Sequence, residues 1–432
     1  MGRNVNGLEG IDLTAMRAGP QLNSAQHNLL ITPVTEQEIV AALNGIGNDK
    51  SSGVDGFGVY FFKKAWQVIK IDVTKAIQEF FVDDKIYKAA NCSLVTLIPK
   101  HNGAKEIKDY RPISCCSTLY KIISKILANR LSKVLGFIVG DNQAAFVKGQ
   151  NIHNHILLTY ELIKGYERKH ISSRCFMQMD IKKAYDTVDW FALESIFNQE
   201  NDNFNYHPKC DKLKITNLCF ADDLLLFSRD IDTETKRAIL QATKFQEGRM
   251  PFKYLGVPVT GKKLATHHYQ PLIDKILDKI KHWTARLLTY AGRLQLINSV
   301  MFSIWNYWPN RFPFPKNVIQ KIEKICRIFL WTGGYEGSRK LPITCKNVCR
   351  PKCYGGMNII DIELWNKSNL IRLLWNLSGK TDSLWIRWIQ AYYVRNKNLM
   401  EIGTRSNDTW IKKAVMMQRY EAIKMQEWQE IK

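Results

Sequence analysis

The sequence predicts an α+β fold, and two observations carry this prediction. Short apolar runs of strand length, at residues 175–180 and on both sides of Asp222 and Asp223, adjoin carboxylates. Longer segments, residues 119–135 and 271–330, repeat apolar residues at the spacing of a helix. We therefore expect a small sheet that is preceded and followed in the chain by helices.

The composition is that of a globular protein with an excess of positive charge. The 432 residues are 45% hydrophobic and 24% charged, which suits two or three domains with several cores. Lys and Arg number 62 against 40 Asp and Glu, a formal net charge of +22. Such an excess suits binding to a phosphate backbone, because each neutralised phosphate releases counterions. A merely soluble basic protein is the alternative, since charge does not determine fold.

Neither a membrane span nor secretion is indicated by the sequence. No run of 18 or more apolar residues is present, and the N-terminus lacks the charged and then apolar segments of a signal peptide. The 10 cysteines are scattered without the spacing of a disulfide framework, which suits a reducing compartment. We expect an intracellular protein without a membrane partner, with the nucleus as the favoured compartment.

The N-terminal part is expected to contain a leader and then helices. Residues 1–30 lack periodicity and are predicted as a loose leader. The pattern from Thr35 to Glu38 is typical of a capping box and predicts a short helix that includes residues 39–43. Along residues 119–135 the apolar stripe is expected to face a core. Other faces of that helix carry Lys121, Lys125, Arg130 and Lys133, and for the lysines solvent is the default surrounding and nucleic acid the alternative.

The most informative stretch is Phe220-Ala221-Asp222-Asp223. The apolar runs on either side of it predict a β-hairpin with both carboxylates at its tip. Folding does not require two adjacent like charges, which repel and resist desolvation, whereas a divalent cation such as Mg²⁺ is bound by carboxylate oxygens. Because Asp is also a common turn residue, the tetrapeptide alone supports a metal site and an ordinary turn about equally.

A second strand-like run favours the metal site. Residues 175–180 end in Asp180, so two adjacent strands would bring together Asp180, Asp222 and Asp223. Three carboxylates at strand ends are able to bind two metal ions. Such a pair of ions holds the attacking and leaving oxygens of an in-line phosphoryl displacement, as in polymerases and nucleases.

These two segments resemble the metal-binding motifs of reverse transcriptases. Further boxes resemble the polymerases of non-LTR, LINE-type retrotransposons of plants, in the order of the family from about residue 31 to about residue 393. The boxes are residues 50–58, 97–100, 109–114, 143–152, 254–258, 283–299 and 349–356. An ordered series of this kind is far more specific than any one box.

The resemblance implies a right-hand polymerase with a shortened palm. Fingers and palm are expected over residues 31–262, a helical thumb-like region over 263–345, and a Trp-rich basic C-terminal region over 346–432. Asp180, Asp222 and Asp223 are the implied ligands of two Mg²⁺ ions, with the Ile181 carbonyl as a further donor. The implied reaction is attack of a primer 3′-hydroxyl on the α-phosphate of a nucleotide.

The resemblance also implies how the nucleotide is bound. Lys100 and Arg111 match fingers positions that hold the triphosphate, and bidentate Arg–phosphate hydrogen bonding supplies the physical reason. Tyr185 matches the aromatic side chain against which the sugar packs, and a 2′-hydroxyl would clash there. The expected partners are therefore an RNA template, a DNA primer and deoxynucleotides, whereas the oligomeric state is not indicated.

The chain departs from the family pattern in two places. The stretch between Asp180 and Asp222 is several dozen residues too short and contains no glycine, so the Gly-Gln-rich box is missing, with an apparent deletion near residues 198–204. A second apparent deletion, near residues 231–251, leaves too little chain for the helix and Lys-containing box expected before residue 254. Misplacing reacting groups by about 1 Å costs on the order of 100-fold in rate, so we predict impaired polymerisation.

The C-terminal region contains two patterns with two interpretations each. Tryptophans among cations are able to stack on bases, but a core role is favoured for Trp331, Trp365, Trp375, Trp385, Trp388, Trp410 and Trp428. Cys345, Cys349 and Cys353 would suit zinc, since thiolates are good ligands. Because no fourth Cys or His lies nearby in the sequence, free thiols in a loop are favoured.

The predicted function is that of an RNA-directed DNA polymerase of a LINE-type retroelement, impaired in this copy. The alternatives are a non-catalytic nucleic-acid-binding remnant and a pseudogene product without function. A metal-dependent nuclease would use similar carboxylates, but the fingers-like setting of Lys100 and Arg111 argues against it.

Overall fold

The computed structural model divides the chain into two compact units, which we describe one at a time. Unit 1 comprises Met1–Asn6, Asp141–Asp189 and Glu200–Lys432, and unit 2 comprises Gly7–Gly140 and Trp190–Gln199. The structure describes residues 22–101, 103–166, 174–180, 210–213, 215–229, 233–243, 245–284, 288–335, 345–380, 382–395, 397, 399, 401–406 and 408–419. The boundaries expected at 262/263 and 345/346 both fall within unit 1.

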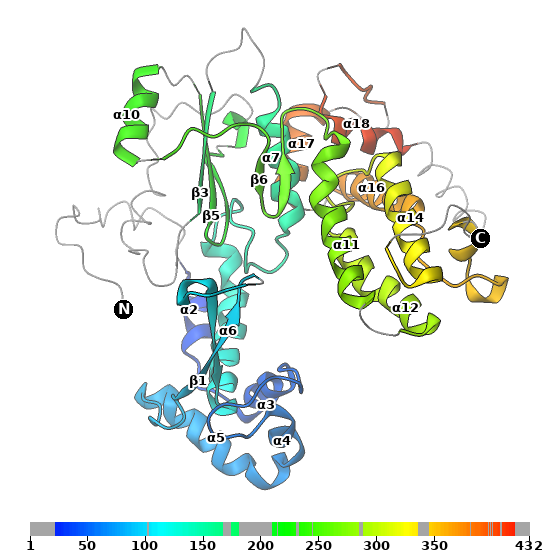
Figure 1. The fold of residues 1–432 in the computed structure, drawn as a ribbon. Coiled ribbons are helices and arrows are strands. Elements are labelled where there is room, and N and C mark those ends of the chain that lie inside the picture. The colour runs from blue at the N-terminus through cyan, green and yellow to red at the C-terminus, as the bar shows by residue number, and fades with distance from the viewer. Residues whose placement is uncertain are drawn as a thin grey trace, which may run out of the picture. The chain divides into compact units, whose positions relative to one another are not determined.

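Unit 2, coloured blue to cyan in Figure 1, is helical with one β-hairpin. Its helices are α2 (Ser24–Ile31), α3 (Glu36–Asn44), α4 (Val59–Lys64), α5 (Trp66–Asp83) and α6 (Thr118–Ile138). The core is formed mainly by aliphatic side chains of α3, α5 and α6, among them Ile39, Leu43, Ile77, Ile122 and Ile126. The predicted helices at 39–43 and 119–135 are thus confirmed as α3 and α6, and Thr35 accepts the capping hydrogen bond from Glu38 N.

Two features of unit 2 were not predicted from the sequence. Residues 24–30, assigned to the leader, belong to α2, where Asn23 and Gln26 form a capping box. No residue of α2 is buried, so the helix lacks the apolar stripe by which periodicity would reveal it. Arg130, expected on a face of α6 other than the apolar stripe, is 5% exposed and binds both carboxylate oxygens of Glu38 at 2.8 and 2.7 Å. Charge compensation allows this burial, and the partner lies 92 positions away in the chain.

The hairpin of unit 2 consists of β1 (Ser93–Pro99) and β2 (Tyr110–Cys116). The two strands are antiparallel, and their register runs from Ser93 opposite Cys116 to Pro99 opposite Tyr110. All residues of β1 are exposed, including the apolar Leu94, Val95, Leu97 and Ile98. This two-stranded ladder therefore has no packed face among the described residues.

Unit 1 contains a three-stranded antiparallel sheet of order β3-β5-β4. The strands are β3 (Arg174–Asp180), β4 (Asn217–Phe220) and β5 (Asp223–Arg229), and Figure 1 shows β3 beside β5. One face is packed into the core through Leu218, Leu225 and Phe227, which are almost fully buried. The strands predicted on both sides of the acidic pair and at residues 175–180 are confirmed.

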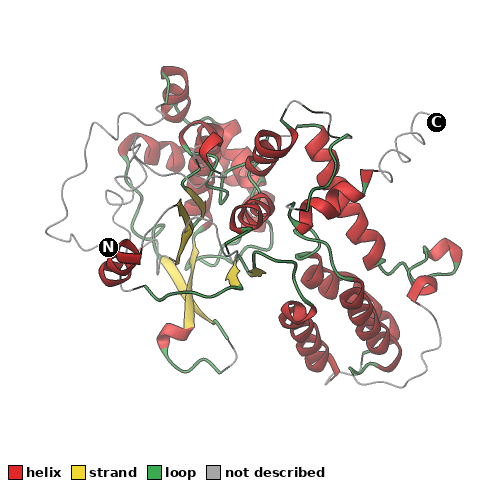
Figure 2. Ribbon diagram, turned by 90° about the horizontal axis from the view of Figure 1, so that it is seen from above, coloured by secondary structure: helices red, strands yellow, loops and turns green. Residues whose placement is uncertain are grey.

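The rest of unit 1 is mainly helical, and Figure 2 shows how few strands the described chain contains. A second hairpin is formed by β6 (Phe252–Tyr254) and β7 (Val257–Val259). The α-helices are α7 (Ile152–Ile163), α10 (Thr233–Thr243), α11 (Gln270–Thr284), α12 (Tyr290–Leu296), α13 (Phe302–Asn306), α14 (Lys316–Thr332), α15 (Cys345–Val348), α16 (Ile362–Ser378), α17 (Leu384–Ile389) and α18 (Trp410–Met417). One core joins the sheet to α7 and to the C-terminal helices.

The helical expectation for residues 271–330 is confirmed by α11 to α14. A π turn, Ile297–Met301, joins α12 to α13, and Pro309, Pro313 and Pro315 fall between α13 and α14. The segment near 231–251 holds more than expected, because α10 is a helix of 11 residues. Only the Lys-containing box remains a candidate for deletion there.

The tryptophans of the C-terminal region confirm the core interpretation with one exception. Trp385 and Trp388 are buried, and Trp331, Trp365 and Trp410 pack against the same core while partly exposed. Trp375 is 64% exposed, and Trp428 lies outside the described residues. Within the described part of the chain, no helix has the length and apolarity needed to span a membrane.

Candidate active site

The acidic hairpin is built from β4, β5 and a two-residue turn. Phe220 pairs with Asp223, which leaves Ala221 and Asp222 between the strands. The backbone of Ala221 has φ +55°, the left-handed region that tight hairpin turns require. A residue with a Cβ pays about 1 kcal/mol for this conformation. The turn therefore places Asp222 at the tip and Asp223 at the first position of β5.

β3 supplies the third acidic position. The strand ends at Asp180, and the register pairs Asp180 directly with Asp223. Directly opposed residues of antiparallel strands have Cα atoms about 4.5 to 5.5 Å apart. The backbone thus brings positions 180, 222 and 223 to one end of the sheet, although the side chain of Asp180 lies outside the described part of the structure.

The outer edge of β4 is covered by the segment that contains Gln143. Cys219 N donates to Asn142 O at 2.7 Å, and Ala144 N donates to Cys219 O at 3.0 Å, which makes a short parallel bridge. The Gln143 side-chain oxygen accepts hydrogen bonds from Ala145 N at 2.9 Å and Ala221 N at 3.3 Å. Gln143 therefore holds the strained turn from the side.

The acidic end borders on the β6–β7 hairpin. Gln178 of β3 donates to Lys253 O at 3.0 Å, and the rings of Phe176 and Phe252 are 4.7 Å apart between centroids. Tyr254 is fully buried on β6. Burial raises the pKa of its hydroxyl, and the charge of Asp223 raises it further, so the phenol stays neutral at physiological pH.

The residue types at the acidic end suit a hard divalent cation. Asp222 is exposed and Asp223 partly exposed, so carboxylate oxygens are accessible at the edge of the sheet. Among the described side chains, no three His, Cys, Asp or Glu residues group together. The side chains of Asp180 and Cys345 lie outside the described part of the structure, so the magnesium and zinc hypotheses both stay predictions.

The other predicted site residues lie elsewhere. Lys100 and Arg111 flank the last pair of the β1–β2 hairpin, Pro99 and Tyr110, and both side chains are exposed. Lys100 donates through Nζ to Lys108 O at 2.6 Å and through N to Asp109 O at 2.8 Å. Both belong to unit 2, whereas the carboxylates belong to unit 1.

Tyr185 lies outside the described residues, so its predicted contact with the sugar stays a prediction. Two residues of the site were missed by sequence reasoning. Gln143 was identified only as the first residue of the family-like box at residues 143–152, and no role was predicted for it. Tyr254 was identified only as the first residue of the box at residues 254–258. The signal was present in both cases, since the two boxes flank the acidic motifs in the family order.

Comparison with known proteins supports the resemblance. Residues 98–201 match the family model described as reverse transcriptase (RNA-dependent DNA polymerase). The uncharacterized 149 kDa protein of transposon TX1 from Xenopus laevis is 31% identical over 170 residues, which cover 39% of this chain and 13% of that protein. The probable RNA-directed DNA polymerase from transposon BS of Drosophila melanogaster is 27% identical over 168 residues, or 38% of this chain and 18% of the relative.

A third relative is a putative ribonuclease H protein of Arabidopsis thaliana, 23% identical over 137 residues, which cover 32% of this chain and 22% of that protein. The chain thus spans only 13 to 22% of the length of these relatives. The expected plant-like subgroup is not singled out, because the relatives come from frog, insect and plant. The chain thus contains a reverse transcriptase domain, matched at residues 98–201, and is similar over part of its length to proteins of transposable elements.

Proposed function

We propose that this chain is the RNA-directed DNA polymerase part of a LINE-type retroelement, in a copy whose polymerisation is impaired. One observation carries the polymerase assignment: Asp180 pairs in register with Asp223 beside a turn that contains Asp222. In the proposed architecture, the β3-β5-β4 sheet belongs to a palm, the β1–β2 hairpin to the fingers, and α11 to α14 to a thumb.

The carboxylates would act at the reacting phosphate. Asp180, Asp222 and Asp223 would hold two Mg²⁺ ions, which when bound supply charge neutralisation for the attacking and leaving oxygens. The protein contributes rigidity, because the turn is fixed by Gln143 on one side and by β3 on the other. Alignment within about half an ångström is needed for such sites, and a buried sheet is suited to provide it.

The nucleotide would be bound by exposed side chains of the fingers. Arg111 presents a planar guanidinium that is able to bind two phosphate oxygens, and Lys100 adds a point charge close by. Tyr185 would pack against the sugar and exclude a ribose 2′-hydroxyl. The substrates of the proposed reaction are an RNA template, a DNA primer and deoxynucleoside triphosphates.

The proposed impairment rests on what is missing between the two acidic motifs. The match to the reverse transcriptase family ends at residue 201, inside the stretch 198–204 in which a deletion was inferred. The acidic hairpin begins only a short distance later, at Asn217. Since no glycine lies between Asp180 and Asp222, the template-supporting box is not present in a divergent form.

Primer extension on an RNA template tests both parts of the proposal. We expect the protein to incorporate deoxynucleotides no better than an Asp222→Asn variant, which retains the size of the side chain but loses its charge. Incorporation more than about tenfold above that variant would establish polymerisation and refute the impairment. If the protein is no more active than the variant, reinsertion of a family-typical segment at residues 198–204 should restore incorporation. A repaired chain that stays inactive would count against the polymerase assignment.

The net charge of +22 favours a second candidate, a nucleic-acid-binding remnant without chemistry. Such a remnant would bind a primer–template duplex with a steep dependence on salt, because counterion release drives the association. Binding without incorporation, even after repair of the missing segment, would favour this candidate over an impaired polymerase.

A further inference from the structure

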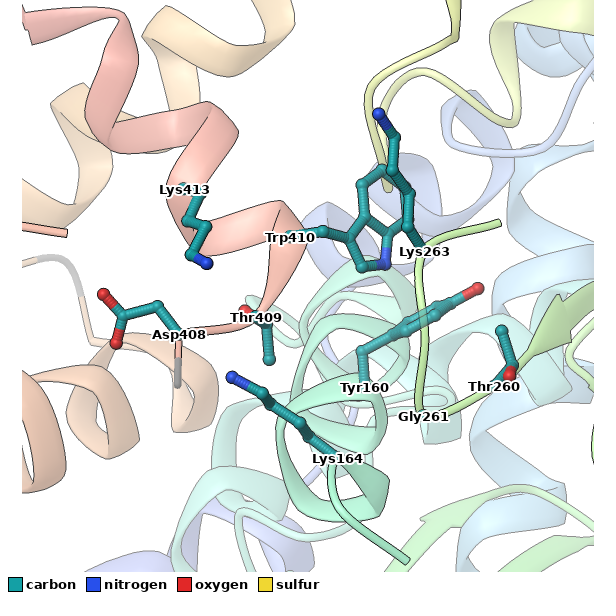
Figure 3. A pocket seen from close by; sticks show the side chains of 9 residues that line it. All are labelled: Tyr160, Lys164, Thr260, Gly261, Lys263, Asp408, Thr409, Trp410 and Lys413. Carbon is teal, nitrogen blue, oxygen red and sulfur yellow. The ribbon is translucent and has the colours of Figure 1, made fainter. Parts of the chain in front are cut away.

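A cavity of about 160 Å³ lies within unit 1 (Figure 3), and none of the three aspartates of the candidate active site lines it. Three separate parts of the chain line it: the end of α7, the loop after β7, and the start of α18. The lining residues are Tyr160, Lys164, Thr260, Gly261, Lys263, Asp408, Thr409, Trp410 and Lys413. With a water occupying about 30 Å³, the volume corresponds to roughly five waters, or one phosphate group with part of a sugar.

The charge of the lining is positive. Lys164, Lys263 and Lys413 line the cavity, and Figure 3 shows the amines of Lys164 and Lys413 pointing toward Thr409. The carboxylate of Asp408 points away from Thr409 and is neutralised by Lys412, whose Nζ lies 2.9 Å from Oδ1. Lys413 donates to Ser406 O at 3.1 Å and retains two further N–H groups, so the lining is cationic at Lys263 and Lys413.

Neutral groups of the lining suit an anion with an organic part. Thr409 caps α18, so the first turn of this helix adds partial positive charge. Trp410 is partly exposed, and its Nε1–H makes no hydrogen bond to any described residue. The indole ring meets the ring of Tyr160 edge to face, with centroids 6.2 Å apart, and is thereby fixed in place.

The wall of the cavity is held by a buried polar network. Glu161 of α7 accepts hydrogen bonds from Thr409 Oγ1 and, at 3.2 Å, from the Tyr393 hydroxyl. The ammonium of Lys412 lies 3.5 Å from the centroid of the Tyr393 ring. Because all these groups are buried or nearly so, α18 is docked on α7 in one register, and the lysines are presented on a rigid frame.

We propose that this cavity binds a backbone phosphate of a nucleic acid strand, with the neighbouring base or sugar against Trp410. Lysines supply charge for the phosphate, and the partly exposed indole ring supplies an aromatic surface whose contact with a base does not depend on base identity. The loop that continues β7 lines the cavity, and the β6–β7 hairpin is hydrogen-bonded to β3, so the strand would be held by the same unit that carries the carboxylates.

This inference rests on the proposed function only for the nature of the ligand, because it requires no chemistry. Its test therefore uses the full chain in EDTA, where catalysis cannot contribute. The measurement is fluorescence anisotropy of a labelled single-stranded RNA at several salt concentrations. The variant is Lys263→Gln with Lys413→Gln, which retains the polar length of both side chains, and the matched control is Lys352→Gln with Lys367→Gln, two exposed lysines that do not line the cavity.

The expected result follows from counterion release. Losing the contact with the one bound phosphate lowers the slope of log affinity against log salt by about 0.7. At about 0.1 M salt this corresponds to an affinity loss on the order of fivefold, against less than about twofold for the control. Equal losses in the variant and the control would overturn the proposal.

Inorganic phosphate alone is the second probe. Suppose that phosphate raises the melting temperature of the wild type and of the control but not of the double variant, while RNA affinity is the same in both variants. The site would then belong to small phosphate ligands, and the nucleic acid assignment would be overturned. Circular dichroism checks folding, and the single variant Lys263→Gln, at an exposed position, replaces the double variant if the latter does not fold. Failure of primer extension leaves all these outcomes unchanged.

Discussion

The two hairpins that carry the predicted site residues differ in their support. β4–β5, with the aspartates, is flanked by β3 on one edge and by residues 142–145 on the other, and one face is buried in the core of unit 1. β1–β2, which carries Arg111 on β2 and Lys100 directly after β1, is a ladder of two strands with its apolar residues exposed. An isolated two-stranded ladder is at best marginally stable in water, whereas a sheet of three or more strands with a packed face is able to be stable on its own.

The difference matches the demands of the proposed chemistry. Carboxylates that share metal ions must be held in a narrow geometry, which a sheet fixed on both edges provides. Charged groups that bind a triphosphate need exposure and reach, which an open hairpin provides. The β4–β5 hairpin of unit 1 thus suits the precise geometry of the carboxylates, and the β1–β2 hairpin of unit 2 suits the exposure of the charged groups.

The largest expected effect concerns how much packing against a core stabilises each hairpin. Leu225→Ala removes a fully buried side chain from the sheet, and we expect unit 1 to lose about 3 kcal/mol of unfolding free energy. The matched change Leu97→Ala on the exposed β1 should cost about 0.5 kcal/mol. Hydrogen exchange during urea unfolding, followed separately for the two units, measures both, and comparable losses would show that the two hairpins are supported alike.

The second prediction concerns the exposed hairpin as a binding surface. Arg111→Gln should weaken deoxynucleoside triphosphate binding to a primer–template complex by roughly 10-fold or more, because hydrogen bonds to charged groups contribute about 1.5 to 3 kcal/mol. Arg111→Lys should fall between, since it retains the charge but loses the planar fork. Equilibrium titration with a labelled nucleotide measures the effect, and Lys105→Gln, exposed on the same hairpin loop, is the control. If the control weakens nucleotide binding as much as Arg111→Gln does, Arg111 contributes only its positive charge and no specific hydrogen bonds to the triphosphate.

The third prediction concerns how unit 2 holds α3 on α6. The hydrogen bonds from Arg130 lower the pKa of Glu38 from its usual value, and the charge of Arg130 lowers it further. Because the folded state binds this proton less readily than the unfolded state, the stabilisation is complete above pH about 4.5 and is lost as pH falls through the folded pKa.

Glu38→Gln should therefore cost unit 2 about 1 kcal/mol at neutral pH and flatten its acid dependence below pH about 4.5. Thermal unfolding of unit 2 between neutral and acidic pH measures both quantities. An unchanged acid slope in the variant would assign the acid sensitivity to other carboxylates.

The smallest expected effect concerns the strained turn. Ala221→Gly should stabilise unit 1 by about 0.5 to 1 kcal/mol, because glycine adopts φ +55° without the Cβ penalty. Ala144→Gly, at a buried position that is not among those with positive φ, should destabilise by a similar amount. Melting temperatures of the two variants are sufficient for the comparison, and two shifts of the same sign would mean that the turn is not strained.

Local pattern was sufficient to predict much of the fold. Strand alternation and the acidic pair predicted β3, β4 and β5, and helical periodicity predicted α6 and the helices from α11 to α14. The helix α2 was not predicted because it has no buried face. The helix α10 was not predicted because the spacing of the family's boxes was expected to leave no room for it. The burial of Arg130 was missed because its partner is distant in the chain.

By itself, the sequence determined the resemblance to reverse transcriptases, the acidic motifs and the strands that carry them, because these depend on residue type and on short periodic patterns. Only the tertiary structure decided that Asp180 faces Asp223 in register, that Gln143 holds the turn, and that lysines from three separate segments line one cavity. The physical reason is that register, edge pairing and cavity lining depend on contacts between distant segments, which local propensity does not encode.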